Sequence, residues 1–178
     1  MTVPRIDALL DPEYGADLPT LDLEEVRRRR TECNEEEVAL SYLRRMVQGR
    51  LDIALAEQRR RTTGAGGSDV ASLIERLPEI LSEKVHAPGF GRLPAIMAPT
   101  EVGEEATLRV DAVAPARCLG SLPDLADGDL AAMAEALQQL EKDVSRQRRR
   151  LHEVIDHLQE EVIRRYRSGE ANVDNLLK

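Results

Sequence analysis

The sequence predicts an all-α protein, built as a long antiparallel coiled-coil helical hairpin with a short middle helix and a Pro/Gly-rich connector. Two stretches of about 40 residues each carry apolar residues at seven-residue spacing, which is the pattern of a coiled-coil seam. The chain between them is rich in Pro and Gly over residues 86–123. Two such helices can bury their seams against each other by folding back as a hairpin.

The first element expected is a flexible N-terminal arm over residues 1–20, with at most one turn at 6–10. A long helix follows over about residues 21–61, with Thr20 or Asp22 as its N-cap. The TTGAGG segment at 62–67 ends this helix. Its seam consists of Val26, Cys33, Leu40, Val47, Leu51, Ala54 and Leu55.

A short amphipathic helix is expected over about residues 69–85, where Pro78 should split it in two. The connector at 86–123 includes one stretch, 107–113, that alternates like a short strand. A second long helix is expected over about 125–168 and a C-terminal tail at 169–178, so that residues 21–168 form a single domain. The apolar stripe of the second long helix consists of Met133, Leu137, Val144, Leu151, Ile155, Leu158 and Val162.

Charge and composition exclude several classes of function. The net charge of -8 argues against direct binding to DNA or to an anionic membrane and favours a basic protein partner. The sequence has neither an apolar run of about 18 residues nor a signal peptide, so we expect a cytoplasmic protein. Cys33 and Cys118 form no C-x-x-C pattern, and no metal site is expected. No Gly-rich phosphate loop or activated nucleophile is visible, and we expect no enzyme.

The two long helices carry the same polar motif, displaced by 104 residues. Its five positions occupy an arc of roughly 80° beside the apolar stripe of each helix. Ion pairing along a coiled coil would explain one copy, but not the recurrence of Ser and two carboxylates in one order and register. The first copy is Glu37, Ser41, Arg44, Gln48 and Asp52, the second is Glu141, Ser145, Arg148, His152 and Asp156, and Arg45 corresponds to Arg149.

The residue types of this motif suit a guanine ligand. An Arg can bond guanine O6 and N7 together, while Asp or Glu can accept from N1–H and the exocyclic amine. Arg45 and Arg149 could neutralise phosphates or stack on bases. Antiparallel helices would turn both copies toward one groove about an approximate two-fold axis. The motif therefore predicts a near-symmetric, anionic ligand with two guanines.

The repeated E-x3-S-x2-R-x3-Q-x3-D motif resembles the RsiG family of actinobacterial anti-sigma factors over about residues 21–168. The resemblance implies that two intercalated cyclic di-GMP molecules bind the coiled coil, and that the loaded protein sequesters the sporulation sigma factor WhiG. It also implies that the first copy forms one half of the nucleotide site and that Glu141, Ser145, Arg148 and Asp156 form most of the other. His152 departs from the family pattern by replacing Gln, which removes one hydrogen bond and adds sensitivity to pH.

The anti-sigma role agrees with the acidic charge of the chain. Sigma factors expose basic surfaces to promoter DNA, and acidic stretches at 21–25, 101–105 and 124–129 could bind them. Two other functions stay open: a cyclic-dinucleotide receptor that acts on another partner, and a coiled-coil adaptor without a ligand.

Overall fold

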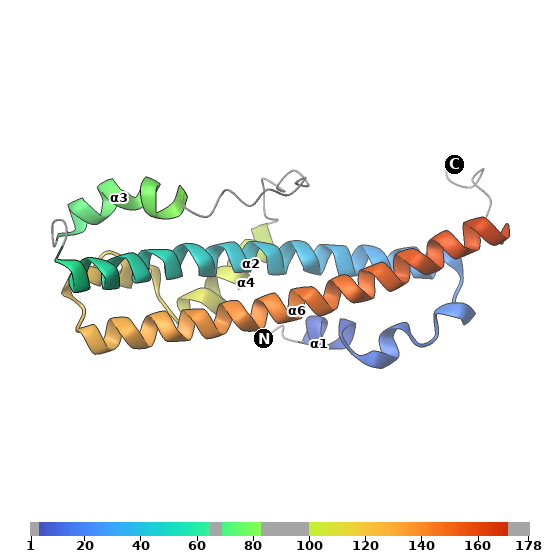
Figure 1. Cartoon of the computed structure of the whole chain (residues 1–178). Helices are drawn as coiled ribbons and strands as arrows, with labels where there is room; N and C mark the ends of the chain where they lie inside the picture. The colour runs from blue at the N-terminus through green and yellow to red at the C-terminus, as the bar shows by residue number, and fades with distance from the viewer. Residues whose placement is uncertain (1–3, 65–68, 83–99, 171–178) are drawn as a thin grey trace. The chain divides into compact units, whose positions relative to one another are not determined.

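The computed structural model describes residues 4–64, 69–82 and 100–170. This part of the chain contains helices and turns and no strand, which confirms the all-α class (Figure 1). In chain order the elements are α1 (Pro4–Leu9), η1 (Pro12–Gly15), η2 (Leu18–Thr20), α2 (Leu23–Thr63), α3 (Val70–Ser82), α4 (Thr100–Asp111), α5 (Ala116–Leu119), η3 (Leu122–Asp124) and α6 (Asp127–Ser168).

The chain divides into two compact units, unit 1 with residues 1–40 and 145–178, and unit 2 with residues 41–144. In unit 1 the beginning of α2 packs against the end of α6, and in unit 2 the end of α2 packs against the beginning of α6. The helical hairpin predicted from the sequence is therefore confirmed.

Both long helices begin and end within two residues of the sequence prediction. The Asp22 carboxylate accepts a hydrogen bond from the backbone N–H of Glu25 at 2.7 Å, so Asp22 is the N-cap of α2. Gly64 follows α2 with φ of 66° and Gly169 follows α6 with φ of 78°, a left-handed conformation that glycine adopts without strain. Local residues thus mark where α2 begins and where both long helices end.

The apolar seam of each unit contains the residues expected from the heptads. Three of the expected seam residues, Leu55, Met133 and Ile155, are half-buried. In unit 1 the buried seam residues are Val26, Cys33, Leu40, Leu151, Leu158 and Val162, and in unit 2 they are Val47, Leu51, Ala54, Leu137 and Val144.

The N-terminal segment differs from the flexible arm expected at 1–20, because its described residues form short helices that pack within unit 1 (Figure 1). Arg165 donates hydrogen bonds to the carbonyl oxygens of Leu18 at 2.6 Å and Leu21 at 2.8 Å. The buried Arg165 side chain therefore holds the N-terminal segment in place, although the sequence of this segment shows no helical periodicity. The side chains that this segment buries are Ile6, Leu9, Leu10 and Leu18.

The middle of the chain is more helical than expected. The strand expected at 107–113 is wrong, because α4 covers residues 107–111 and buries Ala106 and Val110, four residues apart, while Leu108 is 71% exposed. Pro78 lies inside the single helix α3 and does not split it. The expected residues 83–85 of this helix, 86–99 of the connector and 171–178 of the tail lie outside the described residues. None of the helices described is long and apolar enough to cross a bilayer.

Candidate ligand-binding site

Unit 1 brings three motif residues together in what we call the first cluster: Glu37, Arg148 and His152. Arg148 Nε donates to Glu37 Oε1 at 2.8 Å, and His152 Nε2 lies 3.4 Å from the same oxygen. Arg148 and His152 stand one turn apart on α6, so both side chains reach the same point on α2. Their side chains are 34% and 33% exposed, and a ligand can reach them from solvent.

Unit 2 forms a second cluster of the same kind from Glu141, Arg44 and Gln48. Arg44 Nε donates to Glu141 Oε1 at 3.0 Å, and Gln48 Nε2 donates to the same oxygen at 3.2 Å. Here the carboxylate comes from α6 and the donors from α2. Arg44 is 37% exposed, close to the exposure of Arg148 in the first cluster.

The contacts in both clusters join the two copies of the motif. Glu37 of the first copy meets residues of the second copy, and Glu141 of the second copy meets residues of the first. The resemblance implied halves built from one copy each, whereas each cluster takes its carboxylate from one copy and its donors from the other. Antiparallel packing is the signal that could have shown this, since it sets the first position of one copy opposite the third and fourth of the other.

The remaining motif residues differ between the copies. Ser41 and Ser145 are both half-buried, but Asp52 is buried at 8% exposure whereas Asp156 is exposed. Arg45 and Arg149 are exposed and belong to neither cluster. The structure thus brings six of the twelve predicted site residues into two equivalent groups.

Each cluster combines one hydrogen-bond acceptor with two side-chain donors at a partly exposed position. A carboxylate and a guanidinium that are both partly solvated contribute little to folding stability. Their pairing can therefore be exchanged for contacts with a ligand at small cost. The cluster can accept from a ligand through Glu and donate to it through Arg, Gln or His.

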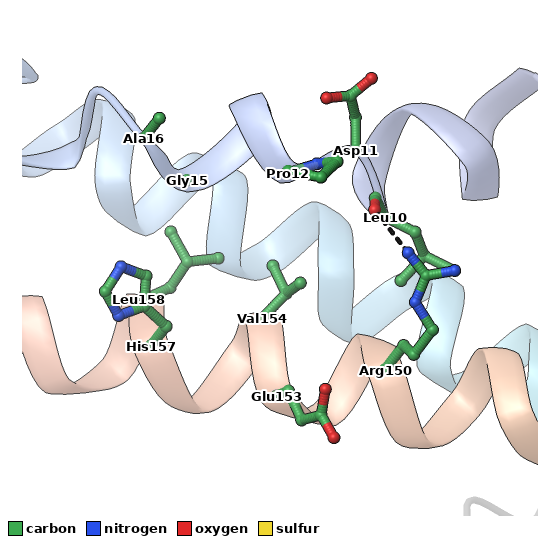
Figure 2. A pocket seen from close by; sticks show the side chains of 10 residues that line it. All are labelled: Leu10, Asp11, Pro12, Gly15, Ala16, Arg150, Glu153, Val154, His157 and Leu158. Carbon is green, nitrogen blue, oxygen red and sulfur yellow. Dashed lines mark hydrogen bonds between the residues drawn. The ribbon is translucent and has the colours of Figure 1, made fainter.

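Unit 1 also has a groove of about 470 Å³ between the N-terminal segment and α6 (Figure 2). Val154 and Leu158 point from α6 toward this segment, and Arg150 donates to the carbonyl oxygen of Leu10 at 2.9 Å. No motif residue lines the groove. The lining residues are Leu10, Asp11, Pro12, Gly15, Ala16, Arg150, Glu153, Val154, His157 and Leu158.

Potential metal ligands do not gather in the part of the chain that the structure describes. These residues contain no group of three or more His, Cys, Asp or Glu side chains that could hold a metal ion. Cys33 is buried and Cys118 is half-buried, and neither is in a disulfide.

The comparison with protein families connects this geometry to a known class. A family model described as RsiG-like matches residues 12–81 and 118–178, which contain α2, α6 and every residue of both clusters. No curated protein matches the sequence. Because the match covers most of the chain, the protein belongs to the RsiG-like family and is a regulator of the anti-sigma-factor type.

Proposed function

We propose that the chain binds two cyclic di-GMP molecules through its two clusters and, when loaded, sequesters a sporulation sigma factor of the WhiG type from promoter DNA and RNA polymerase. The observation that carries this proposal is the repeated geometry. In each unit, one Glu carboxylate oxygen accepts a hydrogen bond from an Arg. The same oxygen also lies within 3.4 Å of a second side-chain nitrogen, from His152 in unit 1 and from Gln48 in unit 2. We propose no catalytic activity for the chain.

The chemistry of each cluster matches one guanine edge. Guanine offers acceptors at O6 and N7 and donors at N1 and N2, which complement the Arg and Glu of a cluster. Without nucleotide, Arg44 and Glu141 bond each other, as do Arg148 and Glu37. On binding, each exchanges this partner for guanine, so the ion pair keeps the side chains placed and satisfied until the ligand arrives.

The charges support an anionic ligand and a basic partner. Two cyclic di-GMP molecules carry about four phosphate charges, which the exposed Arg45 and Arg149 can offset together with the cluster arginines. The filled site then no longer repels a basic sigma surface. Exposed acidic residues add attraction for such a surface, namely Asp22 and Glu24 in unit 1 and Asp124 and Asp129 in unit 2.

Calorimetric titration tests the nucleotide part of the proposal. We expect two nucleotides per chain, and Arg44→Ala or Arg148→Ala should weaken binding at least about tenfold, the loss expected for one paired contact to guanine. Arg28→Ala is the matched control, because Arg28 lies on α2 and pairs with Glu25 and Glu32, both outside the motif. One nucleotide per chain would remove the two-site proposal, and equal binding by all three variants would make the motif structural.

Copurification with a tagged sigma factor, with and without cyclic di-GMP at one salt concentration, tests the partner. Capture should rise with the nucleotide and disappear when a phosphodiesterase degrades it. Nucleotide binding without capture would favour a receptor with another partner, and no saturable nucleotide binding would favour a ligand-free adaptor. Equal capture with and without nucleotide would defeat the switch.

A further inference from the structure

The fourth motif position distinguishes the two clusters, because His152 occupies it in unit 1 and Gln48 occupies it in unit 2. We propose that His152 makes the first cluster a proton-linked cyclic di-GMP site, whereas the second cluster binds the nucleotide without taking up a proton. This inference rests on the proposed function and adds a difference between the two sites.

The two side chains hold equivalent positions. His152 Nε2 lies 3.4 Å from Glu37 Oε1, and Gln48 Nε2 lies 3.2 Å from Glu141 Oε1, in both cases beside an Arg that donates to the same oxygen. An amide donates two hydrogen bonds at any pH in the physiological range. An imidazole offers one donor when neutral and two donors and a positive charge when protonated. The same place in the two clusters therefore carries different chemistry.

The charges around His152 decide the direction of the effect. From α2 the facing charged groups are Glu37 and, two turns away on the same side, Arg30, which bonds Gln159 on α6. On α6 the neighbouring charged groups are Arg148, Arg149 and Asp156. Glu37, the carboxylate nearest the imidazole, is thus already paired with the Arg148 guanidinium when the site is empty.

Nucleotide binding changes the charges around His152. Each cyclic di-GMP molecule brings two negative phosphate charges. Guanine also replaces Glu37 as the partner of Arg148, and Arg148 as the partner of Glu37. The field at His152 becomes negative and favours the imidazolium, so the complex binds a proton more tightly than the empty protein does. By linkage, the proton then strengthens nucleotide binding by the same factor. Affinity at the first cluster should rise as pH falls, and that of the second should not change.

The size of this pH effect on nucleotide affinity is limited. Uptake of one proton changes a binding constant by at most about tenfold per pH unit, and histidine changes charge between about pH 5 and 8. We expect the affinity of the first cluster to be about three- to tenfold higher near pH 6 than near pH 8.

The test is calorimetric titration of cyclic di-GMP into the full chain near pH 6.5 in buffers of different ionisation enthalpy, which counts protons taken up. His152→Gln copies the second cluster into the first, and Gln48→His does the reverse. His157→Gln is the control, because His157 lies on the same helix but lines the groove and belongs to neither cluster. We expect uptake to fall in His152→Gln, to increase in Gln48→His and to remain in His157→Gln.

The possible results separate this inference from the proposed function. Equal proton uptake by wild type and His152→Gln overturns the inference while leaving nucleotide binding in place. No saturable binding by the wild type near pH 6.5 overturns the proposed function itself. If His152→Gln loses helicity by circular dichroism, Gln48→His decides: increased uptake supports the proton link, and unchanged uptake overturns it.

Discussion

At the scale of single residues, arginines that bind backbone carbonyls hold in place the 3-10 helices and turns that lie outside the α-helices. In unit 1, Arg165 binds the carbonyls of Leu18 and Leu21, and Arg29 binds that of Tyr14. In unit 2, Arg61 binds the carbonyls of Leu122 and Leu125. The planar guanidinium can serve several acceptors at once, which the ammonium of lysine does less well.

Arg165 should be the most sensitive of these arginines, because it is only 6% exposed. Arg165→Ala leaves the carbonyls of Leu18 and Leu21 without this donor and should lower the free energy of unfolding by about 2 to 3 kcal/mol. Urea denaturation measures this change. Arg167→Ala, at an exposed position two residues on, should have an effect within about 0.5 kcal/mol. Equal losses in the two variants would contradict the anchoring role.

Glu161 should contribute to the acid sensitivity of the fold. Hydrogen bonds from Arg164 and Arg165 lower the pKa of its carboxyl from 4.5 to about 2. Because the pKa is lowered in the folded state, the stabilisation is present above 4.5 and is lost as the pH falls toward about 2. Glu161→Gln should therefore show a shallower loss of stability with acid in this range, measured by denaturation at a series of pH values. An unchanged slope would show that the pairing is not maintained in solution.

At the scale of elements, the glycine inside α2 and the glycine that follows α2 lead to opposite predictions. Gly49 lies inside the helix, and an added Cβ would have no atom within 4 Å, so Gly49→Ala should stabilise by about 0.5 to 1 kcal/mol. Gly64 ends the helix at φ of 66°, where Gly64→Ala should destabilise by about 1 kcal/mol. Thermal melts of the two variants should move in opposite directions. Shifts of the same sign would contradict these local backbone conformations.

The elements that were predictable from sequence are those whose information is local and repeated. The heptads specified α2 and α6, and Asp22 marked the N-cap because a cap needs only its own neighbours. The packed N-terminal segment was not predictable, since its anchor Arg165 lies more than 140 residues along the chain. The alternation of apolar and polar residues at 107–113 suggested a strand. The helical signal is the four-residue spacing of the buried Ala106 and Val110, and it begins one residue before that stretch.

In the candidate site, too, local patterns were predictable from the sequence and long-range contacts were not. The repeated motif supplied all six cluster residues, because it is a local pattern at fixed spacing. The pairing of Glu37 with Arg148 depends instead on the relative register of α2 and α6, which no single stretch of sequence contains. The burial of Asp52, unlike its counterpart Asp156, likewise depends on packing within unit 2. The sequence supplied the chemistry of the site, and folding decided the partners.

At the scale of the whole molecule, nucleotide and sigma factor should bind with reciprocal coupling. If cyclic di-GMP raises sigma affinity by some factor, sigma must raise nucleotide affinity by the same factor. Both dissociation constants should be measured with and without the other ligand, at one salt concentration and one pH. Unequal factors would mean that another equilibrium, such as self-association, contributes to capture.

The arginine–carbonyl contacts also affect how the sequence can vary during evolution. Every residue offers the same backbone oxygen, so the acceptor survives substitution of the side chain that carries it. In a saturation mutagenesis screen, positions such as Leu21 and Leu125, which are only half-buried, should tolerate many replacements. Their partners Arg165 and Arg61 should tolerate few. The segments outside the α-helices can therefore diverge widely in sequence while the arginines of the long helices continue to bind them.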